Sequence, residues 1–167
     1  MSYAWVRALA LTLGVIGVAL PAARASTAGG GANAMGGNDY AYPYFNKHHP
    51  VRAVLKVPSN PALWPAVPLV ITHNLVSLMG HGIPTKVVLI APGPAIYFFV
   101  QKKNPQAAKL LERLHEMGVR MLACHAAMLA FHVKKSQFFP FVGVARPSGV
   151  TSIFKYEAKG YVYYNMP

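Results

Sequence analysis

Short runs of apolar, β-branched residues alternate along the chain with segments in which apolar residues recur at helical spacing. The helical segments cover residues 69–79, 104–117 and 150–159, and a glycine follows closely on each. The strand-like runs cover residues 51–57, 86–91, 119–123, 141–145 and 161–164. Such alternation predicts one α/β domain, with a mostly parallel five-stranded sheet and helices on both faces in a Rossmann-like layer fold.

Local signals set the expected helix boundaries and faces. Pro65 and Pro68 should delay the first helix to about residue 69, because proline lacks the backbone N–H that a helix interior uses. Asn104 is expected to cap the second helix, with Pro105 at its first position. The third helix should turn four apolar residues inward, namely Val150, Ile153, Phe154 and Ala158.

The N-terminal 25 residues have the features of a signal peptide. Arg7 precedes an apolar run over residues 8–20, and Ala23-Arg24-Ala25 fits signal peptidase. An uncleaved anchor is the alternative, but the run is short for a bilayer span. The expected organisation is a signal peptide at 1–25, a flexible leader at 26–46 and the α/β domain at 47–167. The expected location is the periplasm.

The mature chain is strongly basic. Without Arg7 and Arg24, 14 of the 16 Lys and Arg residues remain against 4 acidic ones, a net charge of +10. The basic residues are scattered, and an exported protein rarely meets nucleic acid, so no nucleic-acid partner is expected. Contact with an anionic membrane or an acidic partner, and life in an acidic medium, remain as alternative uses of this charge.

Cys124 is the only cysteine, so the chain cannot form an internal disulfide. It lies between a strand end and the expected start of a helix at His125 or Ala126, where backbone N–H groups favour a thiolate. Positive charge from His125 or from Lys134-Lys135 could add to this effect. The alternative is a buried and inert thiol, the common state of a lone cysteine.

Other chemistry has weaker support. On one helix, Cys124, Met128 and His132 would share a face and could bind Cu(I), but a lone helical methionine is usually packing, so we expect no metal site. The turn at 91–94 lacks the donors of a phosphate loop, and we expect no cofactor. Ser148 fits a helix cap. The few carboxylates suit helix surfaces or the leader, so conventional hydrolysis is not expected.

The C-terminal third closely resembles proteins of the DsrE/DsrF-like family. In that family a strand ends in a cysteine, a Pro-small-Gly-Val turn opens the last helix, and Gly-Tyr starts the final strand. The residues here that carry the resemblance are Gly118 to Cys124, Met128, Arg146 to Val150 and Lys159 to Tyr163. His73-Asn74-Leu75, Gly80 and the strand at 86–91 also fit, so the resemblance covers about residues 51–167.

The resemblance implies a parallel α/β sheet, a homo-oligomer (trimer or hexamer), and sulfane sulfur carried as a persulfide on Cys124. The protein would be at most a sulfurtransferase-like relay, with Cys124 and His125 as site residues and with sulfur donor and acceptor proteins as partners. Ala126, Ala127 and Pro92 replace polar residues that are frequent in the family. The rival hypothesis is a non-catalytic oligomeric binding module of the same fold. A carrier must present its sulfur, whereas a module need not.

The number of aromatic side chains also favours an oligomer, because the core of a mature chain of this length has limited room for so many large rings. The aromatic residues expected partly at a partner surface are Phe138, Phe139, Phe141, Tyr161, Tyr163 and Tyr164.

Overall fold

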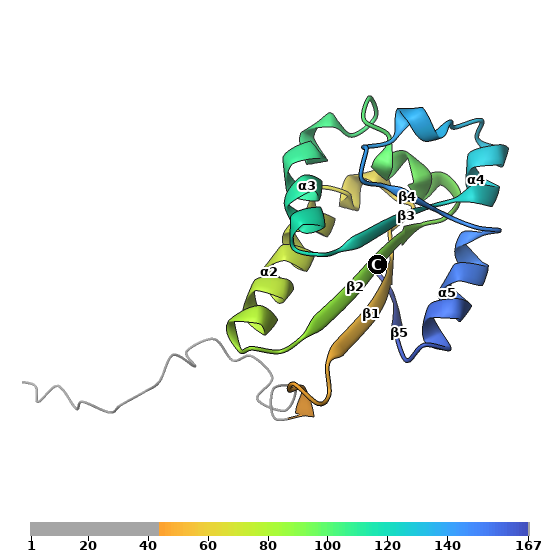
Figure 1. Cartoon of the computed structure of the whole chain (residues 1–167). Helices are drawn as coiled ribbons and strands as arrows, with labels where there is room; N and C mark the ends of the chain where they lie inside the picture. The colour runs from red at the N-terminus through yellow and green to blue at the C-terminus, as the bar shows by residue number, and fades with distance from the viewer. Residues whose placement is uncertain (1–43, 167) are drawn as a thin grey trace, which may run out of the picture. The chain divides into compact units, whose positions relative to one another are not determined.

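Five parallel strands form one sheet in the order β4-β3-β2-β1-β5 (Figure 1). The structure is a computed structural model and describes residues 44–166. The predicted signal peptide and most of the predicted leader lie outside these residues. The strands are β1 (Val51–Lys56), β2 (Thr85–Ala91), β3 (Arg120–Cys124), β4 (Gly143–Ala145) and β5 (Val162–Asn165). The predicted α/β fold with a five-stranded sheet is confirmed, and all four strand pairings are parallel.

The direction of the crossovers decides which face each helix covers. From β1 to β4 the chain steps the same way across the sheet, and right-handed connections then place the intervening helices on one face. The step from β4 back to β5 is reversed, which places its helix on the other face (Figure 1). The helices are α2 (Ala66–Gly80), α3 (Ala108–Glu116), α4 (His125–Ala130) and α5 (Gly149–Glu157). Short 3-10 segments are η1 (Pro61–Leu63), η2 (Gly93–Phe99), η3 (Pro105–Ala107) and η4 (Lys135–Gln137).

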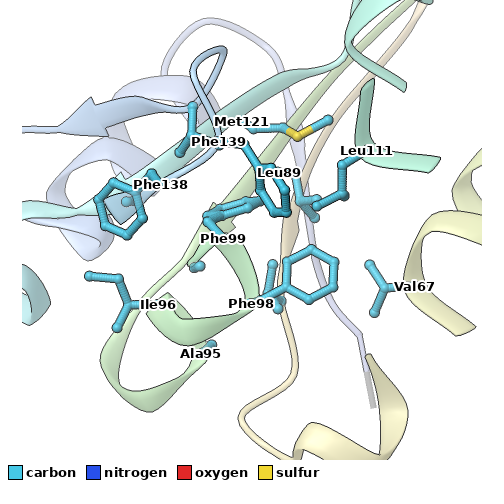
Figure 2. Close-up of a cluster of buried hydrophobic side chains, with 14 of the residues drawn as sticks. Val67, Leu89, Ala95, Ile96, Phe98, Phe99, Leu111, Met121, Phe138 and Phe139 are labelled. Carbon is cyan, nitrogen blue, oxygen red and sulfur yellow. The ribbon is translucent and has the colours of Figure 1, made fainter. Parts of the chain in front are cut away.

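Each face of the sheet has its own hydrophobic core. The larger one packs α2, α3 and η2 on the sheet, with Phe98 and Phe99 fully buried beside Leu89 (Figure 2). The smaller core lies under α5 and consists of Val54, Val88, Ile90, Leu122, Ala145 and Ile153. Within residues 44–166, no helix is both long enough and apolar enough to cross a bilayer.

Two helix starts differ from expectation. Helix α2 begins at Ala66 and contains Pro68, because the N–H groups of a first turn have no partner inside the helix and proline costs little there. Asn104 does not cap a helix with its side chain. Its Nδ2 instead donates to the carbonyl of Phe98 at 3.0 Å in the interior, which makes it a buried tether for η2.

The inward face of α5 was also predicted wrongly. Ile153 is buried, but Val150 and Phe154 are 54% and 65% exposed. The residues that meet the sheet are the small Gly149 and Ser152 together with Ile153. Helix α5 therefore approaches the strands through small side chains and leaves an apolar stripe outside.

Candidate functional site

The register of two neighbouring strands builds the site. Cys124, the last residue of β3, is the partner of Ala145, the last residue of β4. The residues that follow them therefore leave the sheet side by side, and His125 and Arg146 meet: Arg146 Nη1 lies 2.8 Å from His125 Nε2. Because a guanidinium has no acceptor, Arg146 is the donor and Nε2 carries no proton while this bond is made.

Cys124 and Arg146 lie at the ends of two adjacent strands whose following connections go to opposite faces of the sheet. The chain leaves β3 toward α4, on the face of the larger core, and leaves β4 toward α5, on the opposite face. In open α/β sheets, ligands bind outside the carboxyl ends of strands at such a topological switch point. The parallel pairing of β3 and β4 therefore places the cysteine and the 146–149 turn at the same edge of the sheet.

The sulfur of Cys124 receives a hydrogen bond from the start of α5. The backbone N–H of Gly149, the first residue of this nine-residue helix, donates to Cys124 Sγ at 3.0 Å. Ser148 caps the same helix, as expected, because its Oγ accepts the Thr151 N–H at 3.1 Å. The sulfur of Cys124 thus lies at a helix N-terminus and accepts directly from one of its N–H groups.

Gly149 also allows the close approach of helix and thiol. A Cβ at this position would lie 3.2 Å from Cys124 Cβ, 3.2 Å from Ile90 Cγ2 and 3.4 Å from Cys124 Sγ. Any side chain would therefore push α5 away from the sulfur. The glycine is needed for space, because its backbone is ordinary helix.

Exposure differs sharply among the predicted site residues. Cys124 is buried, with only 5% of its surface exposed, whereas His125 is half-buried and Arg146 is exposed. Lys135 was a candidate to supply positive charge beside the thiol. Its Nζ instead donates to the carbonyl of Val142. Lys134 lies exposed at the start of η4. The polar groups beside the cysteine are thus the His125 ring and the Arg146 guanidinium, and Arg146 is the one that is permanently charged.

The helical face that the copper alternative required is not formed. Helix α4 ends at Ala130, and His132 lies beyond it with a φ of 52°, so Cys124, Met128 and His132 do not line up on one helix. Met128 packs against the larger core. Among residues 44–166, no three His, Cys, Asp or Glu side chains are grouped closely enough to hold a metal ion.

The sequence did not predict the contact of Arg146 with His125, nor an apolar groove that lies away from the cysteine. Only the register of β3 and β4 shows that Arg146 lies beside His125.

The apolar groove has a volume of about 400 Å³ and lies between α2 and strands β1 and β5. Its walls include Leu55, Val67, Val70, Ile71, Tyr164 and Met166, and neither Cys124 nor its neighbours line it.

Comparisons with known proteins agree with this fold. The model of the DsrE/DsrF-like family matches residues 71–165. Among solved structures, MTH1491 from Methanobacterium thermoautotrophicum, a protein of unknown function, superposes with a TM-score of 0.59 at 19% sequence identity. The alignment covers 70% of this chain and 99% of that one, so the similarity supports the fold. No curated protein matches the chain.

Proposed function

Because the chain belongs to the DsrE/DsrF-like family, we propose that it handles sulfane sulfur in the periplasm, carrying it as a persulfide on Cys124. The family is of the sulfur-relay type, and this chain has one cysteine at its disposal. A relay of this kind needs a nucleophilic sulfur and a position for the donor, and no cofactor.

The observation that carries the proposal is the hydrogen bond from Gly149 N–H to Cys124 Sγ at 3.0 Å. A hydrogen bond to sulfur is stronger when the sulfur is anionic, so the Gly149 N–H is placed to stabilise the charge that the sulfur bears when it attacks a donor. The family motif Arg146 to Val150 thus has a physical use: its turn brings a helix N-terminus onto the cysteine.

The transfer step balances without an oxidant. The Cys124 thiolate attacks a sulfane sulfur of an anionic donor such as polysulfide, and a new S–S bond forms as the donor's S–S bond breaks. The donor leaves with the electron pair, as a polysulfide shorter by one sulfur. Delivery is the reverse type of step, in which an acceptor thiolate takes the outer sulfur and Cys124 leaves as the thiolate.

Arg146 and His125 supply polar groups beside Cys124, where the sulfur donor would approach. Arg146 is exposed and permanently cationic, so it attracts an anionic donor to the end of β3. His125, hydrogen-bonded through Nε2, has Nδ1 left to carry the ring proton. We assign these two residues to positioning the donor, and Cys124 to the covalent step.

Burial of the thiol favours the rival binding module. With 5% of its surface exposed, Cys124 does not present its sulfur in the described conformation, as a carrier must. Carriage therefore requires the turn at 146–149 to move away from the sulfur for each transfer. Arg146 and Pro147 are exposed and Ser148 is half-buried, so within the turn such an opening would have to expose only the buried Gly149 and break its hydrogen bond to Cys124.

Intact mass after exposure to polysulfide tests the proposal. The native wild type should gain mass in steps of about 32 Da per sulfur atom, reversed by a thiol reductant. Cys124→Ser should keep the fold and gain none. If Cys124 resists both polysulfide and iodoacetamide until the protein is unfolded, the thiol is inert and the binding-module hypothesis replaces this one.

A further inference from the structure

Basic residues form a diagonal row across three neighbouring strands. Arg52 of β1 is the register partner of Lys86 of β2, and Arg120 of β3 pairs two residues further along β2, with Val88. All three side chains are exposed. Like charges at paired positions repel one another, so this arrangement costs stability that the fold must supply elsewhere.

The row lies on the face of the sheet that α5 covers. Arg52, Lys86 and Arg120 each precede a residue of the smaller core by two positions, and side chains two apart on a strand share a face. Those core residues are Val54, Val88 and Leu122. Arg52 also reaches the end of α5, where its Nη1 donates to the carbonyl of Lys159 at 3.4 Å.

Helix α5 adds an outward apolar stripe to this basic face. Val150, Phe154 and Ala158 recur every fourth residue and are all exposed, with Val150 at 54% and Phe154 at 65%. Lys155 and Lys159 follow the last two of them directly. Glu157 is the only carboxylate of α5, while Glu112 and Glu116 belong to α3 on the other face.

We infer that the α5 face, defined as Arg52, Lys86, Arg120, Val150, Phe154, Lys155 and Lys159, is a docking surface for an anionic phospholipid membrane. Basic side chains attract anionic headgroups, while an exposed phenylalanine between lysines can enter the interface. Charge complementarity singles out this face. The other apolar surface, along α2, contains no lysine or arginine and suits an uncharged contact.

The choice of a membrane over nucleic acid follows from the same residues. The aliphatic side chain of Val150 gains nothing from a phosphate backbone, whereas an acyl boundary buries it. Because the start of α5 contacts Cys124, docking by this face would also bring the Cys124 edge toward the membrane surface.

Vesicle sedimentation with position-matched variants tests the inference. The probe is vesicles of phosphatidylcholine with about one third phosphatidylglycerol, against vesicles of phosphatidylcholine alone, and every protein is the chain as recovered from the producing cells. The wild type should bind the anionic vesicles only. The triple variant R52Q/K86Q/R120Q should bind on the order of 100-fold more weakly, about fivefold per removed charge.

The triple variant K102Q/K103Q/K109Q is the charge-matched control, since it removes three exposed lysines away from the α5 face. It should bind nearly as well as the wild type. Phe154→Ser should weaken binding severalfold, whereas Leu69→Ser, at a position 56% exposed on α2, should not. Equal losses in both triple variants would mean that only net charge acts and would overturn the inference. So would wild-type protein that ignores the anionic vesicles, or that prefers duplex DNA.

Discussion

Arg146 Nη1 donates to His125 Nε2 at 2.8 Å, across the gap between the ends of β4 and β3. The contact fixes two things at once. It orients the imidazole beside the only cysteine, and it holds the guanidinium at the edge where the thiol lies. Neither residue is distant in the fold from Cys124, since His125 follows it directly and Arg146 follows its register partner Ala145.

Charge at Arg146 should decide how well anionic reagents reach Cys124. Arg146→Gln should lower the ratio of the alkylation rate by anionic iodoacetate to that by neutral iodoacetamide about two- to fivefold, the range for an exposed charge interaction of up to about 1 kcal/mol. Arg146→Lys should restore much of the ratio. Arg113→Gln on α3 removes an exposed arginine elsewhere and should leave it unchanged. An unchanged ratio in Arg146→Gln would exclude Arg146 from guiding the donor.

A methyl group at Gly149 should separate α5 from the thiol. Gly149→Ala places a Cβ 3.2 Å from both Cys124 Cβ and Ile90 Cγ2, and overpacking of this kind costs about 1–3 kcal/mol of unfolding free energy. Iodoacetamide should then react faster with Cys124, because the helix start no longer covers the sulfur.

Gly80→Ala is the matched control for that substitution. Gly80 closes α2 and a Cβ there meets nothing within 4 Å, so alanine should raise stability by up to about 1 kcal/mol. Urea denaturation of both variants measures the difference. If Gly149→Ala proved as stable as the wild type, with unchanged thiol reactivity, the close contact would not control access.

The fold could be predicted because each strand and helix has its own local signal. Apolar runs, prolines and glycines marked all five strands to within two residues, and the helix after residue 104 showed its stripe directly. Strand order and register carry no such signal, and the meeting of His125 with Arg146 depends on both. The cysteine was therefore predictable as a candidate, while its charged neighbour from the next strand was not.

Helix α5 shows why hydrophobic pattern alone can choose the wrong face. Val150 and Phe154 are more apolar than Gly149 and Ser152, so the pattern favoured them as inward residues. The sheet surface beneath α5 is already filled by Ile90 and Cys124, and a Cβ at position 149 would lie only 3.2 Å from each of them. The small residues Gly149 and Ser152 face the sheet because the short distance between α5 and the strands, and not hydrophobicity, limits packing at this point.

The N-terminal segment makes a separate prediction about processing. The apolar run at residues 8–20 is short for a bilayer span, and Ala23-Arg24-Ala25 fits the peptidase, so cleavage after Ala25 is expected. Intact mass of protein released from the periplasm should correspond to residues 26–167. Recovery of the chain with its first 25 residues, in the membrane fraction, would support the anchor instead.

The apolar groove predicts where a second copy binds. Phe138 and Phe139, two of the rings expected at a partner surface, are in fact core residues, with 2% and 6% of their surface exposed. Tyr164, 56% exposed, does line the groove, together with residues of α2. Large apolar side chains in a helix normally lie buried, yet α2 leaves four of them largely exposed: Leu69, Val70, Val76 and Met79.

We therefore expect a homo-oligomer, a trimer or hexamer, whose contacts cover α2 and the β5 edge. Val70→Lys should shift the molecular mass measured by light scattering toward the monomer, since the new ammonium would be desolvated at the interface. Val150→Lys is its matched control, because Val150 is 54% exposed and Val70 is 55% exposed, but Val150 lies on α5. A monomeric wild type would contradict the expectation of an oligomer. Dissociation by Val150→Lys alone would show that the contact between copies lies on the α5 face instead. The second result would also compete directly with membrane docking, because one surface cannot serve both contacts at once.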